Sequence, residues 1–316
     1  ILEGSGHAED VQIVIVDDGS TKDDTLAKAR EWEGRFPGLV KVVHQENGGH
    51  GMAVLAALEA ADGTYFKIVD SDDWVDEEAL QALLKTLREF IAYETRVDLV
   101  VTNYVYEHAE DGKQNVVDYG FALPKRKIIG WDRIGHFNMA QNMLMHALCY
   151  RTDVLRDGGV PMPAHTFYVD NIYAYVPLPR CRTLYYLDVD LYRYFIGRDD
   201  QSVNEKVMIT RLDQLARVNR AMTEALPARA DVEDKLWRYM VHYLRINAVV
   251  CSVMAQLSGT PEHLALKEEI WETMDDINSE ATERLRKDLL AGLVRHASPA
   301  VVRGGYRAAG FVLGFN

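Results

Sequence analysis

Short hydrophobic segments alternate with amphipathic ones over the first hundred residues, and this alternation restricts the fold more than any other feature. Four segments rich in Val, Ile and Leu have the length of strands that are buried on both faces, at 11–17, 39–43, 65–69 and 97–101. Three segments with helical periodicity separate them, at 21–36, 52–61 and 76–90. Strands and helices that alternate through short connections predict an α/β domain with a mostly parallel sheet and helices on both faces.

Acidic side chains follow two of these predicted strands directly. Asp17 and Asp18 end the first, and the run Asp70 to Asp73 ends the third. Ligands bind at the carboxyl ends of strands in such sheets, and acids gathered there repel one another unless a cation or ligand hydroxyls intervene. A carboxylate of Asp70-Ser71-Asp72 can hold Mg²⁺ or Mn²⁺, which offsets charge on a diphosphate leaving group. The alternative is an N-cap cluster for the helix that begins near Glu77.

The overall composition excludes some classes of protein. Lys and Arg number 35 against 48 Asp and Glu, so the formal charge is −13, which argues against general nucleic-acid binding. Hydrophobic residues make up 48% of the chain, enough for a packed core. No uninterrupted apolar run approaches the roughly 18 residues that would span a bilayer.

Two motifs in order along the chain carry a resemblance to a known family. The segments are IVIVDDGSTKDDT at 13–25 and GTYFKIVDSDDWV at 63–75. Together they resemble glycosyltransferase family 2, inverting nucleotide-sugar transferases of the GT-A fold, over roughly residues 10–205. The resemblance implies a GT-A catalytic domain at 1–204, Mn²⁺ or Mg²⁺ as cofactor, and a UDP-sugar as the expected donor. The acceptor would be a hydroxyl of a surface glycan or a lipid-linked acceptor in polysaccharide biosynthesis.

The resemblance also implies roles for individual residues of the two motifs. Asp18 matches the position that contacts the base of the nucleotide, and capping of the helix near Lys22 is its alternative role. Asp72 matches the direct metal ligand. Asp70 matches an acid that contacts the ribose or supports the metal, and we include it in the expected metal site. Asp73 and Trp74 are assigned to capping and packing.

Two further site residues are expected outside these motifs. Inversion needs a base that removes the proton of the acceptor hydroxyl. Asp170, in Thr-Phe-Tyr-Val-Asp-Asn at 166–171, fits this role best, although Val169 replaces the acid that family members often have before it. A plain helix N-cap is the alternative for Asp170. Arg198 is expected to pair with the diphosphate, or else to form a surface ion pair with Asp199 or Asp200.

The chain departs from the family pattern at its start. Family members begin with a strand, a turn and a helix before the Asp-Asp-Gly-Ser strand, whereas Ile1-Leu2-Glu3 resembles the end of that first helix. We therefore expect a chain that lacks the first β-α unit. Two rival functions stay open at this point: a nucleotidyltransferase on a related fold, and a non-catalytic module that binds sugar nucleotides. The intact Asp70-Ser71-Asp72 argues against the second.

Helical periodicity continues through 207–226, 232–257 and 261–290, so a helical C-terminal region is expected over 205–316. From residue 284 onward, basic residues alternate with apolar ones, and Asp288 is the single acid. This tail suits either packing within its own domain or contact with an anionic membrane surface. The expected location of the protein is cytoplasmic, with peripheral contact on the inner membrane face through 284–316 if the tail has the second role.

Overall fold

The computed structural model describes residue 1 and residues 10–108, 112–196 and 204–313, with side chains to residue 306. The chain forms two compact units, Ile1–Arg198 and Asp199–Asn316. The sequence analysis placed the domain boundary after residue 204.

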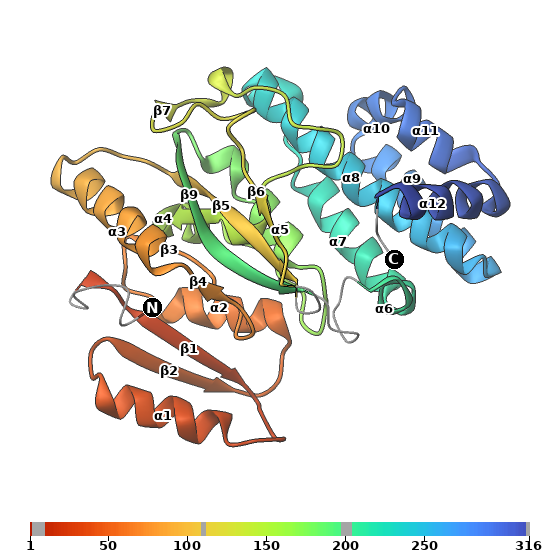
Figure 1. Ribbon diagram of the computed structural model, residues 1–316. Helices are drawn as coiled ribbons and strands as arrows, with labels where there is room; N and C mark the ends of the chain where they lie inside the picture. The colour runs from red at the N-terminus through yellow and green to blue at the C-terminus, as the bar shows by residue number, and fades with distance from the viewer. Residues whose placement is uncertain (2–9, 109–111, 197–203, 314–316) are drawn as a thin grey trace. The chain divides into compact units, whose positions relative to one another are not determined.

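A small parallel sheet comes first in the chain. Strands β1 (Ile13–Asp18) and β2 (Val40–Gln45) pair in parallel, and helices α1 (Thr25–Arg35) and α2 (His50–Ala60) pack against them (Figure 1). The apolar side chains of Ala29, Val40 and Val42 form the core of this part. The βαβ arrangement brings the end of β1 next to the loop that follows β2.

A second sheet of seven strands forms the centre of the first unit. Its order is β3-β8-β5-β9-β4, with β6 paired to β5 and β7 paired to β9. The strands are β3 (Tyr65–Phe66), β4 (Trp74–Val75), β5 (Leu99–His108), β6 (Gln114–Val117), β7 (Ile128–Ile129), β8 (Leu148–Arg151) and β9 (Leu184–Ile196). Figure 1 shows β5 and β9 side by side.

The direction of the strands differs from the expected mostly parallel sheet. The pairs β1–β2 and β5–β9 are parallel, and the other five pairs in the described part of the chain are antiparallel. A strand buried on both faces is hydrophobic whichever way its neighbour runs, so the sequence pattern does not reveal direction. The α/β class is confirmed, with a mixed central sheet.

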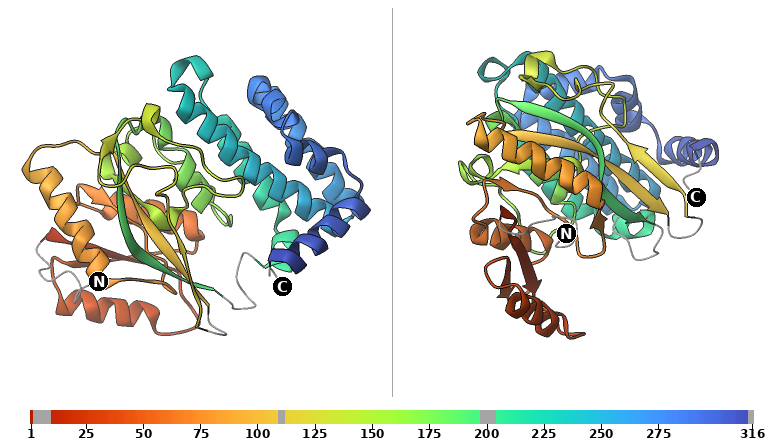
Figure 2. Two further views of the ribbon diagram at one scale, coloured as in Figure 1. Left: turned by 45° about the horizontal axis from the view of Figure 1, so that its top comes forward. Right: turned by 60° about the vertical axis from the view of Figure 1, so that its left-hand side comes forward.

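Helix α3 (Glu77–Ala92) packs against this sheet and closes its core (Figure 2). Its buried face carries Leu80, Leu83 and Leu87, which join Val97 and Val100 in one cluster. The side chain of Asp76 accepts a hydrogen bond from the Ala79 N–H and caps the helix. Two short helices follow later, α4 (Thr152–Arg156) and α5 (Asp170–Tyr175).

The second unit is helical, as the sequence predicts. Its helices are α6 (Glu205–Thr210), α7 (Leu212–Glu224), α8 (Asp234–Ser258), α9 (Pro261–Ile277), α10 (Ser279–Arg286), α11 (Leu289–His296) and α12 (Pro299–Leu313). Helix α8 packs against α7, α9, α11 and α12. Among the described residues it is the one helix long and apolar enough to cross a membrane, with a mean hydropathy of 1.2 over its most apolar window, but 67% of that window is buried. Burial to this extent is the pattern of a core helix.

A buried aspartate joins the starts of the two longest strands. Asp98 is 1% exposed, and its carboxylate accepts hydrogen bonds from the Arg182 and Thr183 N–H groups at 2.7 and 3.1 Å. It also accepts a hydrogen bond from Arg96 Nε at 2.7 Å. An amide in its place has a single acceptor oxygen and no charge.

We therefore expect Asp98→Asn to lower the free energy of unfolding by about 1–3 kcal/mol, the usual cost of a buried polar group left without a full set of partners. Urea denaturation would measure the change. The matched control is Asp153→Asn, because Asp153 also pairs with Arg96 but is more exposed. The control should cost at most about 1 kcal/mol, and equal losses in the two variants would contradict the structural role of Asp98.

Candidate active site

The end of β1 and the glycine-rich loop after β2 are bonded together through Asp18. Its carboxylate accepts hydrogen bonds from the Gly48 and Gly49 N–H groups, both at 2.8 Å, and from Gln45 Nε2 at 2.7 Å. Burial raises the pKa of Asp18, but these hydrogen bonds outweigh it, so the pKa lies below its ordinary value. Asp18 therefore fixes the shape of the loop at 47–51, and the N-cap position of α1 belongs to Asp24 and not to Asp18.

The same loop contacts the segment that leads into α5. The Gly48 carbonyl accepts a hydrogen bond from the His165 N–H at 2.7 Å. Gly49 has φ of +85°, and a Cβ there would lie 3.1 Å from the His165 backbone, so a larger residue would be both strained and crowded. Two segments far apart in sequence thus meet at this loop.

The acids of Asp70-Ser71-Asp72-Asp73 lie on a turn between β3 and β4, where the Asp73 N–H bonds to the Asp70 carbonyl. Tyr192 on β9 holds this turn. Its hydroxyl donates to Asp73 Oδ2 at 2.7 Å, lies 3.3 Å from Asp70 Oδ2, and accepts from the Asp70 N–H. The Phe195 N–H donates to the other oxygen of Asp73. Asp73 therefore bonds to β9 and does not cap α3, contrary to expectation.

Burial raises the pKa of Asp73 to about 6, against the hydrogen bonds from Tyr192 and Phe195, and the charges of Asp72 and Asp70 raise it further. The carboxylates thus lie close enough to repel one another. Asp72 is exposed, so its side chain lies at the rim of the group.

His146 lies beneath the acids, at 6% exposure, on the 3₁₀ turn Met145–Ala147. Its ring stacks on Tyr194 with centroids 4.5 Å apart and contacts Tyr192 at 4.7 Å. Burial lowers its pKa to about 4, so the ring is neutral at physiological pH. Its Nδ1 is buried without a hydrogen-bond partner among the described residues.

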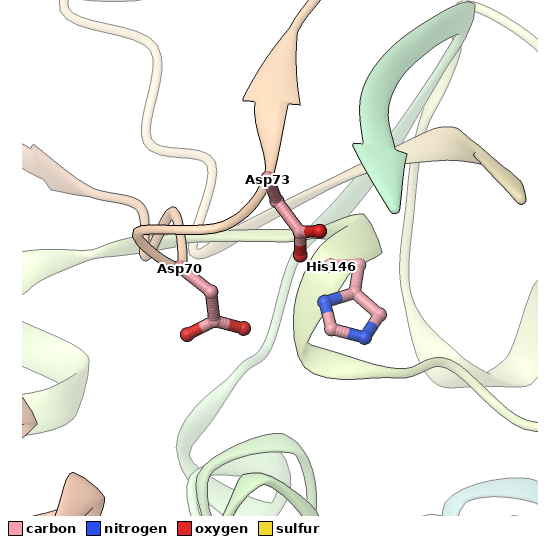
Figure 3. A group of neighbouring side chains, drawn as sticks. All are labelled: Asp70, Asp73 and His146. Atoms are coloured by element: carbon pink, nitrogen blue, oxygen red, sulfur yellow. The ribbon is translucent and has the colours of Figure 1, made fainter. Parts of the chain in front are cut away.

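Asp70, Asp73 and His146 form a group that can bind a metal ion. One donor atom from each lies within 4.8 Å of the others, and the three side chains point toward one another (Figure 3). Two carboxylates and a neutral imidazole are suitable ligands for a divalent cation. The unpartnered Nδ1 and the mutual repulsion of the acids both fit a cation here. This group shares Asp70 with the pair expected from the sequence but contains Asp73 and His146 in place of Asp72.

His50 connects this group to the start of α5. Its Nε2 lies 3.1 Å from Asp70 Oδ1. Burial lowers the pKa of His50, but Asp70, followed by Asp170 and Asp18, raises it overall. Asp170 is the first residue of α5, where Val169 takes the N-cap position. The pKa of Asp170 is raised, first by burial and then by Asp70, and His50 opposes this shift.

The structure thus brings together four of the five residues that the sequence analysis singled out. Asp18, Asp70, Asp72 and Asp170 lie around one group of charges, and Arg198 falls outside the described residues.

Sequence reasoning missed the residues that connect them. Asp73 was assigned to capping and packing, and His50, His146 and Tyr192 were not among the expected site residues. The acidic run contained a signal for Asp73, since it adjoins Asp72. Nothing local in the sequence pairs Tyr192 with residues more than a hundred positions away.

Comparison with known proteins finds one family over the first part of the chain. The family model of glycosyl transferase family 2 matches residues 3–146. EpsH from Bacillus subtilis is 34% identical over 105 residues, which is 33% of this chain and 28% of EpsH. Glycosyltransferase GlyG from Streptococcus pneumoniae is 35% identical over 105 residues, 33% of each chain. This chain therefore spans about a third of the length of these two relatives.

A solved structure shows the same fold over nearly the whole chain. The crystal structure of TarS residues 1–349 from S. aureus matches with a TM-score of 0.65 at 16% identity, and covers 98% of this chain and 86% of that one. The sequence and the fold therefore agree: residues 3–146 match glycosyl transferase family 2, and the chain has the same α/β fold as TarS.

Proposed function

We propose that this protein transfers a sugar from a nucleoside diphosphate sugar, with UDP as the nucleotide, to a hydroxyl of a surface glycan or lipid-linked acceptor. The observation that carries the proposal is the grouping of Asp70, His50 and Asp170 beside the loop held by Asp18, within a family 2 domain. The structurally similar TarS has been solved in complex with UDP-GlcNAc, which supports a UDP-sugar as donor.

In this proposal Asp170 acts as the general base of an inverting displacement. The acceptor oxygen forms a bond to the anomeric carbon, and the bond from that carbon to the diphosphate oxygen breaks with its electron pair. Asp170 takes the hydroxyl proton. Its raised pKa suits this role, because a base works best when its pKa approaches the operating pH. Since the base must be deprotonated, turnover should fall as the pH drops through that pKa.

The acidic turn is the proposed cation site. Asp70 and Asp72 would hold Mn²⁺ or Mg²⁺, and the group of Asp70, Asp73 and His146 is a second donor set that shares Asp70. A bound divalent cation would supply charge stabilisation for the departing diphosphate. Tyr192 orients Asp70 and Asp73 in either case. Asp18 is proposed to face the base of the nucleotide, and Arg198 the diphosphate.

We expect Asp72→Asn to weaken Mn²⁺-dependent binding of UDP by more than about tenfold, since even groups outside the metal's own ligands contribute that much. Because Asp72 is exposed, the fold should tolerate the change. Calorimetric titration of UDP with and without Mn²⁺ would measure it. The control is His146→Gln, which should retain binding. If His146→Gln abolishes the Mn²⁺ effect and Asp72→Asn retains it, the cation binds at Asp70, Asp73 and His146.

We expect Asp170→Asn to reduce turnover by about 10²–10⁴-fold, the usual contribution of a general base, with little change in UDP binding. The amide keeps the shape of the side chain and removes its basicity. Hydrolysis or transfer from UDP-sugars would measure turnover, and Asp157→Asn, an exposed aspartate on the same unit, is the matched control. Turnover within a few-fold of the unchanged protein would show that Asp170 is structural.

The tail offers a separate proposal about location, a cytoplasmic protein in peripheral contact with the inner membrane face. Helices α10 to α12 pack on α8 and α9, and Ala291, Val294 and Val302 are buried. Packing is therefore one role of the tail. Leu289 is 90% exposed, and Leu293 and Val301 are also exposed, so an apolar surface lies among basic residues. We propose that this surface contacts anionic lipid.

The double variant Leu289→Glu/Leu293→Glu should therefore lose binding to phosphatidylglycerol vesicles in a co-sedimentation assay. Binding by the unchanged protein should weaken at high salt, because salt screens exposed charges. Ile277→Glu is the control, since Ile277 is exposed and apolar but precedes the tail. No binding by the unchanged protein would leave packing as the single role of the tail.

A further inference from the structure

A pocket of about 370 Å³ lies beside β5 and β6 in the first unit, next to the acidic group but separate from it. Its lining includes Tyr104 and Tyr106 of β5 and the residues Asn138, Gln141 and Asn142. We infer that this pocket holds the terminal sugar ring of the acceptor, and that the ring is uncharged. The inference rests on the proposed function, since it assigns the second substrate of the same transfer.

The lining suits a neutral sugar by its chemistry. Every residue of the lining is uncharged, and the set combines two tyrosines with three side-chain amides. The faces of a sugar ring carry C–H groups that pack on aromatic rings, and amides can both donate to and accept from its hydroxyls. An uncharged lining offers nothing to neutralise a carboxylate or phosphate, whose desolvation would then be costly. A volume of this size is also typical of small-molecule sites.

One amide in the lining is available for a ligand. Asn138 Nδ2 donates to Gln141 Oε1 at 3.1 Å, and Gln141 Nε2 donates to the Asp118 carbonyl, so these two side chains are already engaged with the protein. Asn142 is 8% exposed, and its backbone carbonyl accepts from the Tyr119 hydroxyl. Within the described ranges its side-chain amide makes no hydrogen bond that would compete with a ligand. Solvent reaches the polar atoms of this amide, so a sugar hydroxyl can replace water there.

A continuous row of rings connects the pocket to the acids. The rings of Tyr106 and Tyr194 lie 5.5 Å apart, and Tyr194 stacks on His146. Tyr104 also contacts His146, edge to face, with centroids 5.7 Å apart. The charge of Asp170 acts on Tyr194, as do the charges of Asp73 and Asp70. The pocket wall therefore touches His146 through Tyr104 and lies one ring away from His146 through Tyr106.

The pocket and the proposed nucleotide end of the site lie at opposite ends of one series of interactions. The series runs from the Asp18 loop to His50, which contacts Asp70 and feels the charge of Asp170. The charges of both acids act on Tyr194, whose ring contacts Tyr106. A donor whose base is at the Asp18 end would place its sugar near Asp70. An acceptor ring in the pocket would then approach from the opposite end, past Asp170. Inversion requires attack from the face opposite the leaving group.

The test uses the methyl β-glycosides of glucose, galactose and N-acetylglucosamine as probes, with glucuronic acid as the charged comparison. Saturation-transfer NMR on the whole protein, with UDP and Mn²⁺ present, detects weak binding of each. The variants are Asn142→Leu, which keeps volume and removes the amide, and Tyr106→Ala, which removes the wall. Tyr106→Phe restores the ring, and Asn115→Leu is a control on the exposed face of β6. Circular dichroism checks that each variant is folded.

At least one neutral glycoside should bind, and Asn142→Leu should weaken its binding by about two- to tenfold, the loss expected for one or two hydrogen bonds. Tyr106→Ala should weaken it as well, while Tyr106→Phe and Asn115→Leu retain it. The inference is overturned if no neutral glycoside binds, if all variants bind equally, or if glucuronic acid alone binds. UDP affinity, measured on the same samples, separates the two proposals: a protein that binds neither UDP nor any UDP-sugar refutes the proposed function, whatever the pocket variants do.

Discussion

The hydroxyl group of Tyr192 is the contact on which the arrangement of the acids depends. Asp70 and Asp73 lie on one turn, and their charges would drive them apart in a partly buried site. One hydroxyl bonds to both carboxylates and to the Asp70 N–H, and so ties the turn to β9. Strand β9 is in turn paired with β5 along ten residues. The position of the acids is therefore set by the longest strand pairing in the sheet and not by the turn alone. Side chains held by a paired strand keep their geometry better than side chains held by a loop.

Beneath the acids, packed aromatic rings bury part of the carboxylate surface. His146 stacks on Tyr194 and packs at a tilt against Tyr192. The Lys67 ammonium lies against the Tyr192 ring and donates to the His146 carbonyl at 2.7 Å. Burial lowers the pKa of Lys67 to about 8. Low polarity strengthens every charge interaction above these rings, which explains why Asp73 and Asp170 both hold protons more tightly than a solvated carboxyl. The same rings lie between the acids and the pocket on β5. Tyr104, which lines the pocket, contacts His146 directly.

The residues that could be predicted from the sequence share one property, a place in a short motif at a strand or helix end. Asp18, Asp70 and Asp72 follow hydrophobic strands, and Asp170 begins a helix, so local pattern and the family resemblance were sufficient to predict that they lie near one another. Tyr192 and His146 act through contacts that span from about 75 to 120 residues, and no local pattern records such a contact. The α/β class followed from periodicity, but strand direction did not, because burial on both faces produces the same hydrophobic run in parallel and antiparallel pairs.

The glycine-rich loop at 47–51 also fixes the geometry of the site. It contacts both Asp18, at the proposed nucleotide end, and the segment that leads to Asp170, the proposed base. Asp18 holds the loop by two backbone N–H groups, and the loop holds His165 by the Gly48 carbonyl. From His165 the chain passes through Tyr168, which has an uncommon φ of +67°, and enters α5 at Asp170. His50 lies at the end of this loop, where α2 begins, and bonds to Asp70. A nucleotide that bonds to Asp18 would compete for the lone pairs that now hold Gly48 and Gly49. The loop therefore joins the proposed nucleotide end of the site to the segment that carries the proposed base, through hydrogen bonds at Asp18 and His165.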